Sequence, residues 1–366
     1  MQIFKRKRAT DASDDLMKAE VSGMPQTAGT NDDYDLKVRQ QIDQYVKEAI
    51  HDLPEIFHVW SNDFIRPGLL DVFNVESVND FYVGAAKEVS GDFKRPLRIL
   101  SVGCGDGTVE IELAKSLRKA EAEFRLEGAD LSPVLIERFE SAVQDSDLEG
   151  LVFPKVEDLN QVAPGQKYDL VMANHSLHHI VDLEKVFDFI WDALTPDGIF
   201  ATCDMIGRNG HMRWPETEAM LQAVWPLLSE RQRYQHQLQH AQPDRFEDFD
   251  ASKEGFEGIR AQDILYLILN KFHSYKFFGY GGFIEVLVDR GFGPGFNPLD
   301  DRDRQLVTTL AKYNDMMLDA GMIRPTIMSA YFTKDDRGET CFRGRSALQS
   351  LRLPFETPDW VKHQAG

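Results

Sequence analysis

The middle of the chain alternates short apolar runs with amphipathic segments. From Pro96 onward, four of the apolar runs are short and almost unbroken, as expected for strands buried on both faces of a sheet: LRILSV, FRLEGADL, YDLVMAN and GIFATCD. The segments between them carry apolar residues at helical spacing: VEIELAKSLRKA, SPVLIERFESAV and LEKVFDFIWDAL. This alternation predicts an α/β fold in which helices cover both faces of a doubly wound sheet.

The flanking regions show different patterns. Residues 34–95 are aromatic-rich with helical spacing and predict an N-terminal helical lid over the core, which spans 96–206. Residues 207–272 return to helical spacing and predict a helical cap insert. The segments HSYKFFGY and RPTIMSAYFTK, within 273–334, predict two strands that complete the sheet. The polar ends, 1–33 and 335–366, predict a disordered tail and an irregular tail.

Composition narrows the possible partners. Of the 366 residues, 42% are hydrophobic, which is enough for a large buried core. The formal net charge of −19 repels phosphate backbones, so we expect a small-molecule partner and no nucleic acid. Three cysteines without ligand-like spacing predict reduced thiols and no metal site: Cys104, Cys203 and Cys341.

Location follows from what the apolar runs lack. None approaches the roughly 20 residues needed to cross a bilayer, and the basic start MQIFKRKRAT has no apolar stretch behind it. We therefore expect a cytoplasmic protein with no membrane contact. The sequence leaves monomer and homodimer both open.

A glycine loop follows the first predicted strand directly. LRILSV runs into Gly103-Cys104-Gly105-Asp106-Gly107-Thr108 and then into a helix, and Asp130 closes the second strand. Glycines let the backbone approach a ligand closely, and the helix start offers free N–H groups. An acid at the end of the second strand accepts hydrogen bonds from ribose hydroxyls. The spacing differs from the dinucleotide GxGxxG pattern, and no phosphate-binding Gly-Lys-Ser/Thr follows.

The combination of these motifs resembles a known family. SVGCGDGT, GADLS, VEDL and YDLVMANHSLHHIVDLEKV together resemble the class I S-adenosylmethionine-dependent methyltransferases over residues 96–206. The resemblance implies a Rossmann-like, doubly wound, seven-stranded sheet with an antiparallel last strand. It also implies S-adenosylmethionine as cofactor.

The resemblance assigns residues to the cofactor. It places the glycines on the methionine part, Asp130 on the ribose and Leu131 near the adenine, with Asp158 facing the adenine amino group. The full set of expected cofactor-binding residues is Gly103, Gly105, Gly107, Asp130, Leu131, Asp158, Leu159, Asn174 and His175. A tight turn for the glycines and a helix cap for Asp158 are the structural alternatives.

The stretch DMIGRNGHMRWPE, residues 204–216, is the candidate acceptor wall. Methyl transfer to a hydroxyl or amine requires removal of a proton, and histidine titrates in the useful range. We expect His211 as base, with Asp204 orienting an imidazole and Arg213 holding a polar substrate, while His178 and His179 are further candidates. The alternative is a structural loop that anchors the cap through arginine–glutamate pairs and a buried Trp214.

Three functions remain open at this point. The first is methyl transfer from S-adenosylmethionine to a hydroxyl or amine of a small molecule, either a secondary metabolite or a saccharide. This fits the resemblance of GRNGHMRWPE and GFEGIRAQDIL to a poorly characterised bacterial methyltransferase group. The second is cyclisation of S-adenosylmethionine itself with release of methylthioadenosine. The third is binding of S-adenosylmethionine without turnover.

Overall fold

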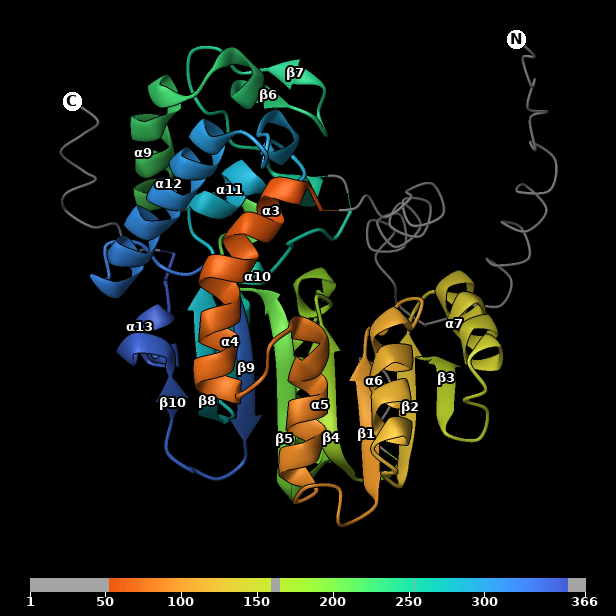
Figure 1. The fold of residues 1–366 in the computed structure, drawn as a ribbon. Coiled ribbons are helices and arrows are strands. Elements are labelled where there is room, and N and C mark those ends of the chain that lie inside the picture. Colours follow the sequence, from red (N-terminus) through yellow and green to blue (C-terminus); the bar gives the residue numbers. More distant parts are fainter. Residues whose placement is uncertain (1–52, 159–164, 254, 355–366) are drawn as a thin grey trace, which may run out of the picture.

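The fold centres on one large mixed sheet. The computed structural model describes residues 53–158, 165–253 and 255–354. Figure 1 shows the sheet with helices packed in front of it and a further group of elements above its upper edge. The strands of the sheet are β1 Leu97–Val102, β2 Phe124–Asp130, β3 Val152–Val156, β4 Tyr168–Asn174, β5 Leu194–Met205, β8 His273–Tyr280, β9 Ile327–Thr333 and β10 Thr340–Cys341.

Strand order creates the place where a ligand binds in such folds. The order is β10-β8-β9-β5-β4-β1-β2-β3, with β1 parallel to both β2 and β4. The chain leaves β1 toward β2 on one side and returns to β4 on the other. Open α/β sheets bind ligands at the carboxyl ends of the strands where the order reverses. Here that point lies between the ends of β1 and β4.

The strand prediction is largely confirmed. Strand β9 pairs antiparallel with both β5 and β8, so the last of the seven main strands is antiparallel. The eighth strand, β10, pairs parallel with β8 over two residues inside the segment 335–366 that the sequence predicted to be irregular. Strand β3 was not predicted because proline and lysine interrupt the apolar pattern of VFPKV, which is mostly half-buried, unlike the internal strands.

The helices have bounds close to those predicted for the core. They are α3 Glu55–Trp60, α4 Arg66–Phe73, α5 Val78–Val89, α6 Thr108–Lys119, α7 Pro133–Asp145, α8 Leu183–Ala193, α9 Pro215–Val224, α10 Ala261–Leu269, α11 Ile284–Val288, α12 Asp301–Asp319 and α13 Ala347–Ser350. A π-helical turn at Ser61–Ile65 joins α3 to α4. Among the described residues, no helix combines the length and apolar character needed to cross a membrane.

The predicted N-terminal lid is wrong for much of residues 53–95. Figure 1 shows α4, α5 and α6 side by side in front of the sheet, where α4 and α5 serve as ordinary face helices. The rings of Phe73, Phe81 and Tyr331 lie 4.8–4.9 Å apart, and all three are buried between these helices and β9. Apolar aromatics drive this segment onto the sheet because burying them removes large surfaces from water. The residues before 53 lie outside the described part.

The cap also differs from its predicted bounds. Residues 281–326, with α11 and α12, join the segment that carries α9 and the short strands β6 Tyr234–Gln235 and β7 His240–Ala241 above the sheet (Figure 1). We call residues 207–259 and 281–326 the cap. Helix α10, which was predicted to belong to the insert, instead packs beside α8 on the far face of the sheet. Its residues Ile264, Leu265 and Ile268 belong to the hydrophobic core on that face.

Ion pairs with buried carboxylates join the two segments of the cap. Arg213 pairs with Glu285 of α11, which also accepts a hydrogen bond from the Thr326 hydroxyl. Arg231 lies 2.5 Å from Asp303 of α12, a carboxylate that is 4% exposed. Because removal of one partner leaves a charge in a dry environment, these pairs hold the two segments of the cap against each other.

Candidate functional site

The three glycines of the loop after β1 have different structural roles. All three adopt left-handed backbone angles, with φ of +66° at Gly103, +56° at Gly105 and +77° at Gly107. A Cβ at Gly103 would lie 2.5 Å from Ser176, and one at Gly107 would lie 1.9 Å from the Phe139 ring. A Cβ at Gly105 would meet nothing within 4 Å. Packing therefore requires glycine at the two outer positions, while Gly105 faces open space at the sheet edge.

The expected ribose-binding acid closes this side of the site. Asp130 ends β2, and its two carboxylate oxygens accept hydrogen bonds from Gly105 N and Ser132 N, each at 2.9 Å. Burial raises the pKa of Asp130, and these backbone N–H groups oppose the shift. Leu131 beside it is 39% exposed, which leaves an apolar surface at the edge. A ligand would therefore meet a carboxylate and an apolar side chain next to each other.

The next strand ends contribute further expected residues. Asp158 is half-buried just after β3, where Glu157 N donates to Asp130 O at 2.9 Å. Leu159, also expected at the cofactor, lies outside the described residues. Asn174 ends β4, and its Oδ1 accepts a hydrogen bond from the hydroxyl of the fully buried Tyr82 at 3.1 Å. Tyr82 packs inside the core and reaches the edge only with its hydroxyl.

A serine joins the glycine loop to the histidines. The Ser176 hydroxyl donates to Val102 O at 2.7 Å, which places the residue against Gly103. Its backbone N–H and that of Leu177 donate to Asp204 Oδ2 at 3.0 and 2.8 Å. Asp204 Oδ1 lies 2.6 Å from His178 Nδ1. The predicted orienting role of Asp204 therefore falls on His178 rather than on His211.

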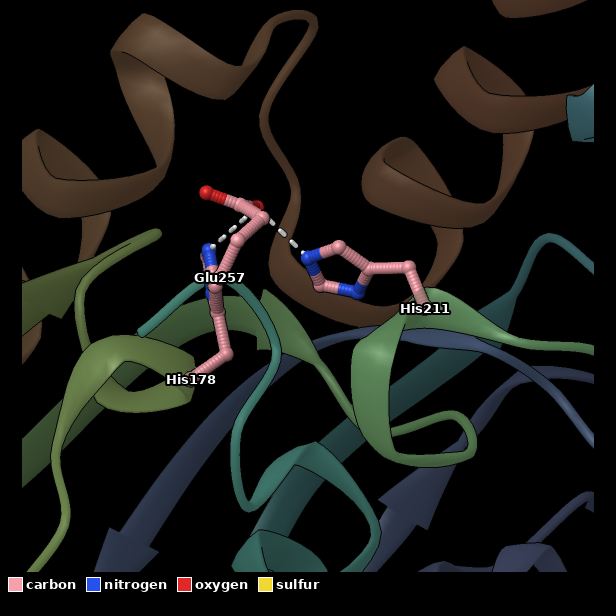
Figure 2. A group of neighbouring side chains, drawn as sticks. All are labelled: His178, His211 and Glu257. Atoms are coloured by element: carbon pink, nitrogen blue, oxygen red, sulfur yellow. Dashed lines mark hydrogen bonds and ion pairs between the residues drawn. The ribbon is translucent and has the colours of Figure 1, made fainter. Parts of the chain in front are cut away.

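Glu257 brings two of the histidines together. Its Oε1 lies 2.6 Å from His211 Nε2 and 3.5 Å from His178 Nε2, and its Oε2 lies 3.7 Å from His179 Nδ1. Figure 2 shows Glu257 between the rings of His178 and His211. We call His178, His211 and Glu257 the histidine–carboxylate cluster, which Asp204 and His179 adjoin.

Charges in this group shift its titration strongly. Burial lowers the pKa of His178, but the charges and hydrogen bonds of Asp204 and Glu257 outweigh that effect and raise it to about 10. Burial lowers the pKa of His179 to about 3, and the adjacent His178 adds to the shift. Burial opposes ionisation of Glu257, but hydrogen bonds from His178 and His211 hold its pKa well below the usual range. The two carboxylates and three imidazoles thus behave as one electrostatic unit.

The loop that contains His211 also has a structural role. The Arg213 guanidinium pairs with Glu285 and does not join the histidine–carboxylate cluster. Trp214 is 3% exposed, and Arg352 stacks over its ring at 4.6 Å. Arg208 donates to Arg213 O at 3.3 Å. One half of the stretch 204–216 therefore faces the cluster, while the other half anchors the cap.

Other polar groups near the edge are accounted for by neighbours. His175, expected at the cofactor, is exposed, has φ of +48° and places Nε2 3.6 Å from Cys203 Sγ. Arg260 makes two hydrogen bonds to Glu184, at 2.6 and 2.8 Å, and one to Asp263 at 2.9 Å. These contacts connect the start of α10 to α8. Arg260 and Asp263 therefore have a structural role.

Sequence reasoning missed two acids at the site. Glu257 stands in GFEG, between Gly255 and Gly258, whose φ values are +109° and +66°. A glycine pair around a single acid signals a tight turn that presents a side chain, which was the available clue. Glu110 of α6 is 2% exposed, accepts a hydrogen bond from the Ser101 hydroxyl at 2.5 Å and has a second oxygen without a partner. Its helical spacing within VEIEL gave no sign of burial.

The residues at the edge fit S-adenosylmethionine. The fit rests on the open position at Gly105, the partly exposed Leu131 and the Asp130 carboxylate, which together offer close backbone approach, an apolar surface and a hydrogen-bond acceptor. A nucleoside needs those three features. The start of α6 adds a positive helix end beside the same loop.

Comparison with protein families agrees with this fit. Residues 77–254 match a family model described as a methyltransferase domain. The malonyl-[acyl-carrier protein] O-methyltransferase 1 of Ilyobacter polytropus is 26% identical over 141 residues, covering 38% of this chain and 48% of that protein. The malonyl-[acyl-carrier protein] O-methyltransferase of Acetivibrio thermocellus is 30% identical over 125 residues, covering 34% and 40%. The chain spans less than half the length of these curated relatives.

The solved structures that are similar to this chain share little sequence with it. The O-methyltransferase from a trans-AT polyketide synthase of Brevibacillus brevis, in complex with S-adenosyl-L-homocysteine, has a TM-score of 0.39 and 12% identity, covering 84% of this chain and 81% of that one. The [4+2]-cyclase SpnF has a TM-score of 0.40 and 16% identity, covering 82% and 94%.

Proposed function

Since residues 77–254 form a methyltransferase domain of the class I S-adenosylmethionine-dependent type, we propose that this chain transfers a methyl group from S-adenosylmethionine to an oxygen of a small-molecule acceptor. One observation carries the choice of acceptor atom. The histidine–carboxylate cluster stands at the same sheet edge as the glycine loop, and Ser176 links the two because it lies against Gly103 and donates to Asp204, which contacts His178.

The cofactor would lie across the carboxyl ends of β1 and β2. Gly105 and the start of α6 would hold its amino-acid part, Asp130 its ribose, and Leu131 with Asp158 its adenine. When bound, S-adenosylmethionine supplies a methyl group on a positively charged sulfur. The chain's own contribution is alignment and exclusion of water, because displacement at such a methyl group needs no protonation of the leaving group.

The histidine–carboxylate cluster would serve the acceptor. A hydroxyl must lose its proton as it gains the methyl group, and in the metal-free chain the Glu257 carboxylate, whose Oε1 lies 2.6 Å from His211 Nε2, would accept that proton. Glu257 is the most accessible member, with 36% of its side chain exposed against 5% for His178 and 18% for His211. An acceptor would therefore approach from the Glu257 side.

The relatives supply one alternative acceptor class. Both curated relatives are named for an acyl group on a carrier protein, so an acyl chain bound to a carrier is a second candidate acceptor. A carboxylate acceptor needs no proton acceptor. The paired imidazoles and Glu257 favour a hydroxyl, and the net charge of −19 favours a free small molecule over an acidic macromolecule.

Product analysis tests the proposal. Purified chain is incubated with methyl-labelled S-adenosylmethionine and a panel of polyhydroxylated aromatics, saccharides, amines and carrier-bound acyl acids. The proposal expects S-adenosylhomocysteine and one labelled, O-methylated product. Methylthioadenosine without acceptor labelling would indicate cyclisation instead, and binding without consumption across the panel would indicate a silent binding protein.

A further inference from the structure

The histidine–carboxylate cluster has the composition of a metal site, which the sequence did not predict. One ligand atom each from His178, His211 and Glu257 lies within 4.8 Å of the others. We propose that these three side chains bind one divalent zinc ion through His178 Nε2, His211 Nε2 and the Glu257 carboxylate. The binding itself is independent of the enzyme's reaction, and only its use in catalysis rests on the proposed function.

The distances suit a tetrahedral ion. Zinc binds imidazole nitrogen and carboxylate oxygen at about 2.0–2.2 Å, which places neighbouring ligand atoms about 3.3 Å apart. The separations of Glu257 Oε1 from His211 Nε2 and His178 Nε2, 2.6 and 3.5 Å, lie on either side of that value. Small side-chain rotations bring the three atoms around one centre, as their convergence in Figure 2 suggests.

Asp204 sets the orientation of His178. This carboxylate is fully buried and accepts from Ser176 N, Leu177 N and Met205 N as well as facing His178 Nδ1 at 2.6 Å. An acceptor so placed requires that Nδ1 carries the proton. In the neutral imidazole, the Nε2 lone pair then points toward Glu257. A carboxylate that holds the outer nitrogen of a metal-binding histidine is the usual supporting contact in such sites.

Charge balance calls for a cation at the same place. With neutral imidazoles, the Nε2 lone pair of His178 faces a carboxylate oxygen at 3.5 Å, so two acceptors confront each other. Asp204 and Glu257 together contribute two negative charges, and Asp204 is 0% exposed. One divalent ion neutralises this pair and separates the two acceptors, whereas protons must do so at two positions.

The backbone holds the two cap ligands in place. His211 has φ of +53°, although it is not a glycine, and Gly210 beside it has φ of +67°. Gly210 N donates to Gly258 O at 2.8 Å, and a Cβ at Gly258 would lie 2.9 Å from His211 N. The loops of His211 and Glu257 are therefore pinned against each other. Left-handed backbone angles in non-glycine residues are strained, and they occur mainly at sites where the surrounding structure holds a functional side chain in place.

Ligand chemistry favours zinc over magnesium and calcium. Magnesium and calcium take oxygen ligands, so two imidazoles argue against them. Two histidines and one carboxylate with an open fourth position are a pattern of catalytic zinc, in which the ion lowers the pKa of a bound hydroxyl or water. In the proposed function the open position would receive the acceptor oxygen.

Metal titration tests the site in the whole chain. Tag-free protein is stripped with a chelator, and its binding of Zn²⁺ is measured by calorimetry, together with the absorption spectrum of Co²⁺ as a stand-in. The inference expects one equivalent bound, intense visible Co²⁺ bands typical of four ligands, and at least a tenfold weaker affinity in His211→Ala and Glu257→Gln. His236→Ala, which removes an exposed imidazole outside the cluster, should bind like the wild type.

A positioning variant and two outcomes complete the design. Asp204→Asn should weaken Zn²⁺ binding by about 10- to 100-fold without abolishing it. X-ray absorption of the zinc-loaded wild type should show two imidazoles, a result that does not depend on whether any variant folds. Zinc binding that is absent, or unchanged in both ligand variants, overturns the inference.

The two proposals fail separately. Methyl transfer that persists in the chelator-treated, zinc-free chain would overturn a catalytic role for zinc and leave the proposed function standing. Stoichiometric zinc at the cluster with methylthioadenosine as the sole product would support the site and contradict the proposed function. Binding of S-adenosylhomocysteine by each variant, measured by calorimetry, reports that the rest of the fold is intact.

Discussion

The glycine loop and the histidine–carboxylate cluster share one edge of the sheet but are assembled differently. The loop and Asp130 come from a single β1–α6–β2 unit, and the backbone of Gly105 bonds directly to Asp130. The cluster takes its members from three loops, with His211 and Glu257 separated by 46 positions. One region is set by local chain geometry, and the other by how the cap docks on the sheet.

This difference predicts where damage should spread. A change that loosens the cap should disturb the histidine–carboxylate cluster and leave the glycine loop intact, because β1, α6 and β2 make their own contacts. A change in the loop should affect cofactor binding whether or not the cap is well docked. The following substitutions test that separation.

The largest effect is expected from the ion pair that joins the two segments of the cap. Arg213→Gln leaves Glu285, whose side chain is 8% exposed, without its cation. Removing one partner of a buried pair typically costs about 3–5 kcal/mol, so we expect a large drop in the free energy of unfolding and in turnover, measured by denaturant titration and product formation. Affinity for S-adenosylhomocysteine should stay within about twofold, since this ion pair touches none of the loop's contacts.

A surface pair provides the control for this substitution. Arg66 and Glu76 are 51% and 66% exposed, so Arg66→Gln should change stability by less than about 1 kcal/mol. If Arg213→Gln weakens cofactor affinity as much as turnover, the two regions are not separable in the way described.

Packing behind the glycine loop gives the next effect. Gly107→Ala places a Cβ 1.9 Å from the Phe139 ring at φ of +77°. Overpacking together with backbone strain should lower the free energy of unfolding by about 2–4 kcal/mol, measured in urea. Gly150→Ala has a similar φ of +81° but no atom within 4 Å, so it should lose only about 1 kcal/mol. Equal losses would contradict the packing assigned to Gly107.

A buried acid beside the loop predicts a pH effect on stability. Burial raises the pKa of Glu110 from 4.5 to about 7, against the hydrogen bond from Ser101. Because the folded value lies above the unfolded one, its contribution to stability is fully present below pH 4.5 and is lost as the pH rises through about 7. Glu110→Gln should remove this loss and stabilise the chain at pH 8 by about 1–3 kcal/mol, measured in urea.

The matched control lies on the same helix. Glu112 is 53% exposed and pairs with Lys115, so Glu112→Gln should leave the pH profile of stability unchanged. A profile that is identical for Glu110→Gln and the wild type would show that Glu110 is not kept protonated by burial.

The smallest effect separates ligand contact from strain. Gly105→Ala and Gly150→Ala both force alanine into left-handed backbone with open space around the Cβ. Their losses of stability should match, at about 1 kcal/mol. Only Gly105→Ala should weaken the binding of S-adenosylhomocysteine, by roughly tenfold, because the alanine methyl group enters the space of the proposed cofactor. Equal cofactor affinities for the two variants would remove Gly105 from the cofactor site.

The same contrast explains how much the sequence could predict. Buried strands give unbroken apolar runs, and glycines with positive φ mark a loop, so the core, Gly105 and Asp130 were predicted from adjacent residues. Strand β3 was missed because Pro154 and Lys155 interrupt its apolar pattern at the sheet edge. The two-residue β10 is too short to leave a pattern.

The cluster was predicted only in part. Its members His178 and His211 and the adjoining Asp204 were named as candidates because each lies at or after the end of a predicted strand. Their partners were not predictable, since Glu257 reaches them only through docking of the loop before α10. Arg213 was expected at the substrate, but its guanidinium forms an ion pair with Glu285. The burial of Glu285 depends on how the cap folds.

The central claim is that cofactor binding and methyl transfer reside in these two regions. The most direct measurement compares Asp130→Ala with Glu257→Gln for S-adenosylhomocysteine affinity, by calorimetry, and for turnover at saturating cofactor. We predict that Asp130→Ala loses roughly tenfold or more in affinity. Glu257→Gln should keep affinity within about twofold while turnover falls by about 100-fold or more. Wild-type turnover in Glu257→Gln, or a loss of affinity equal to that of Asp130→Ala, would contradict the account.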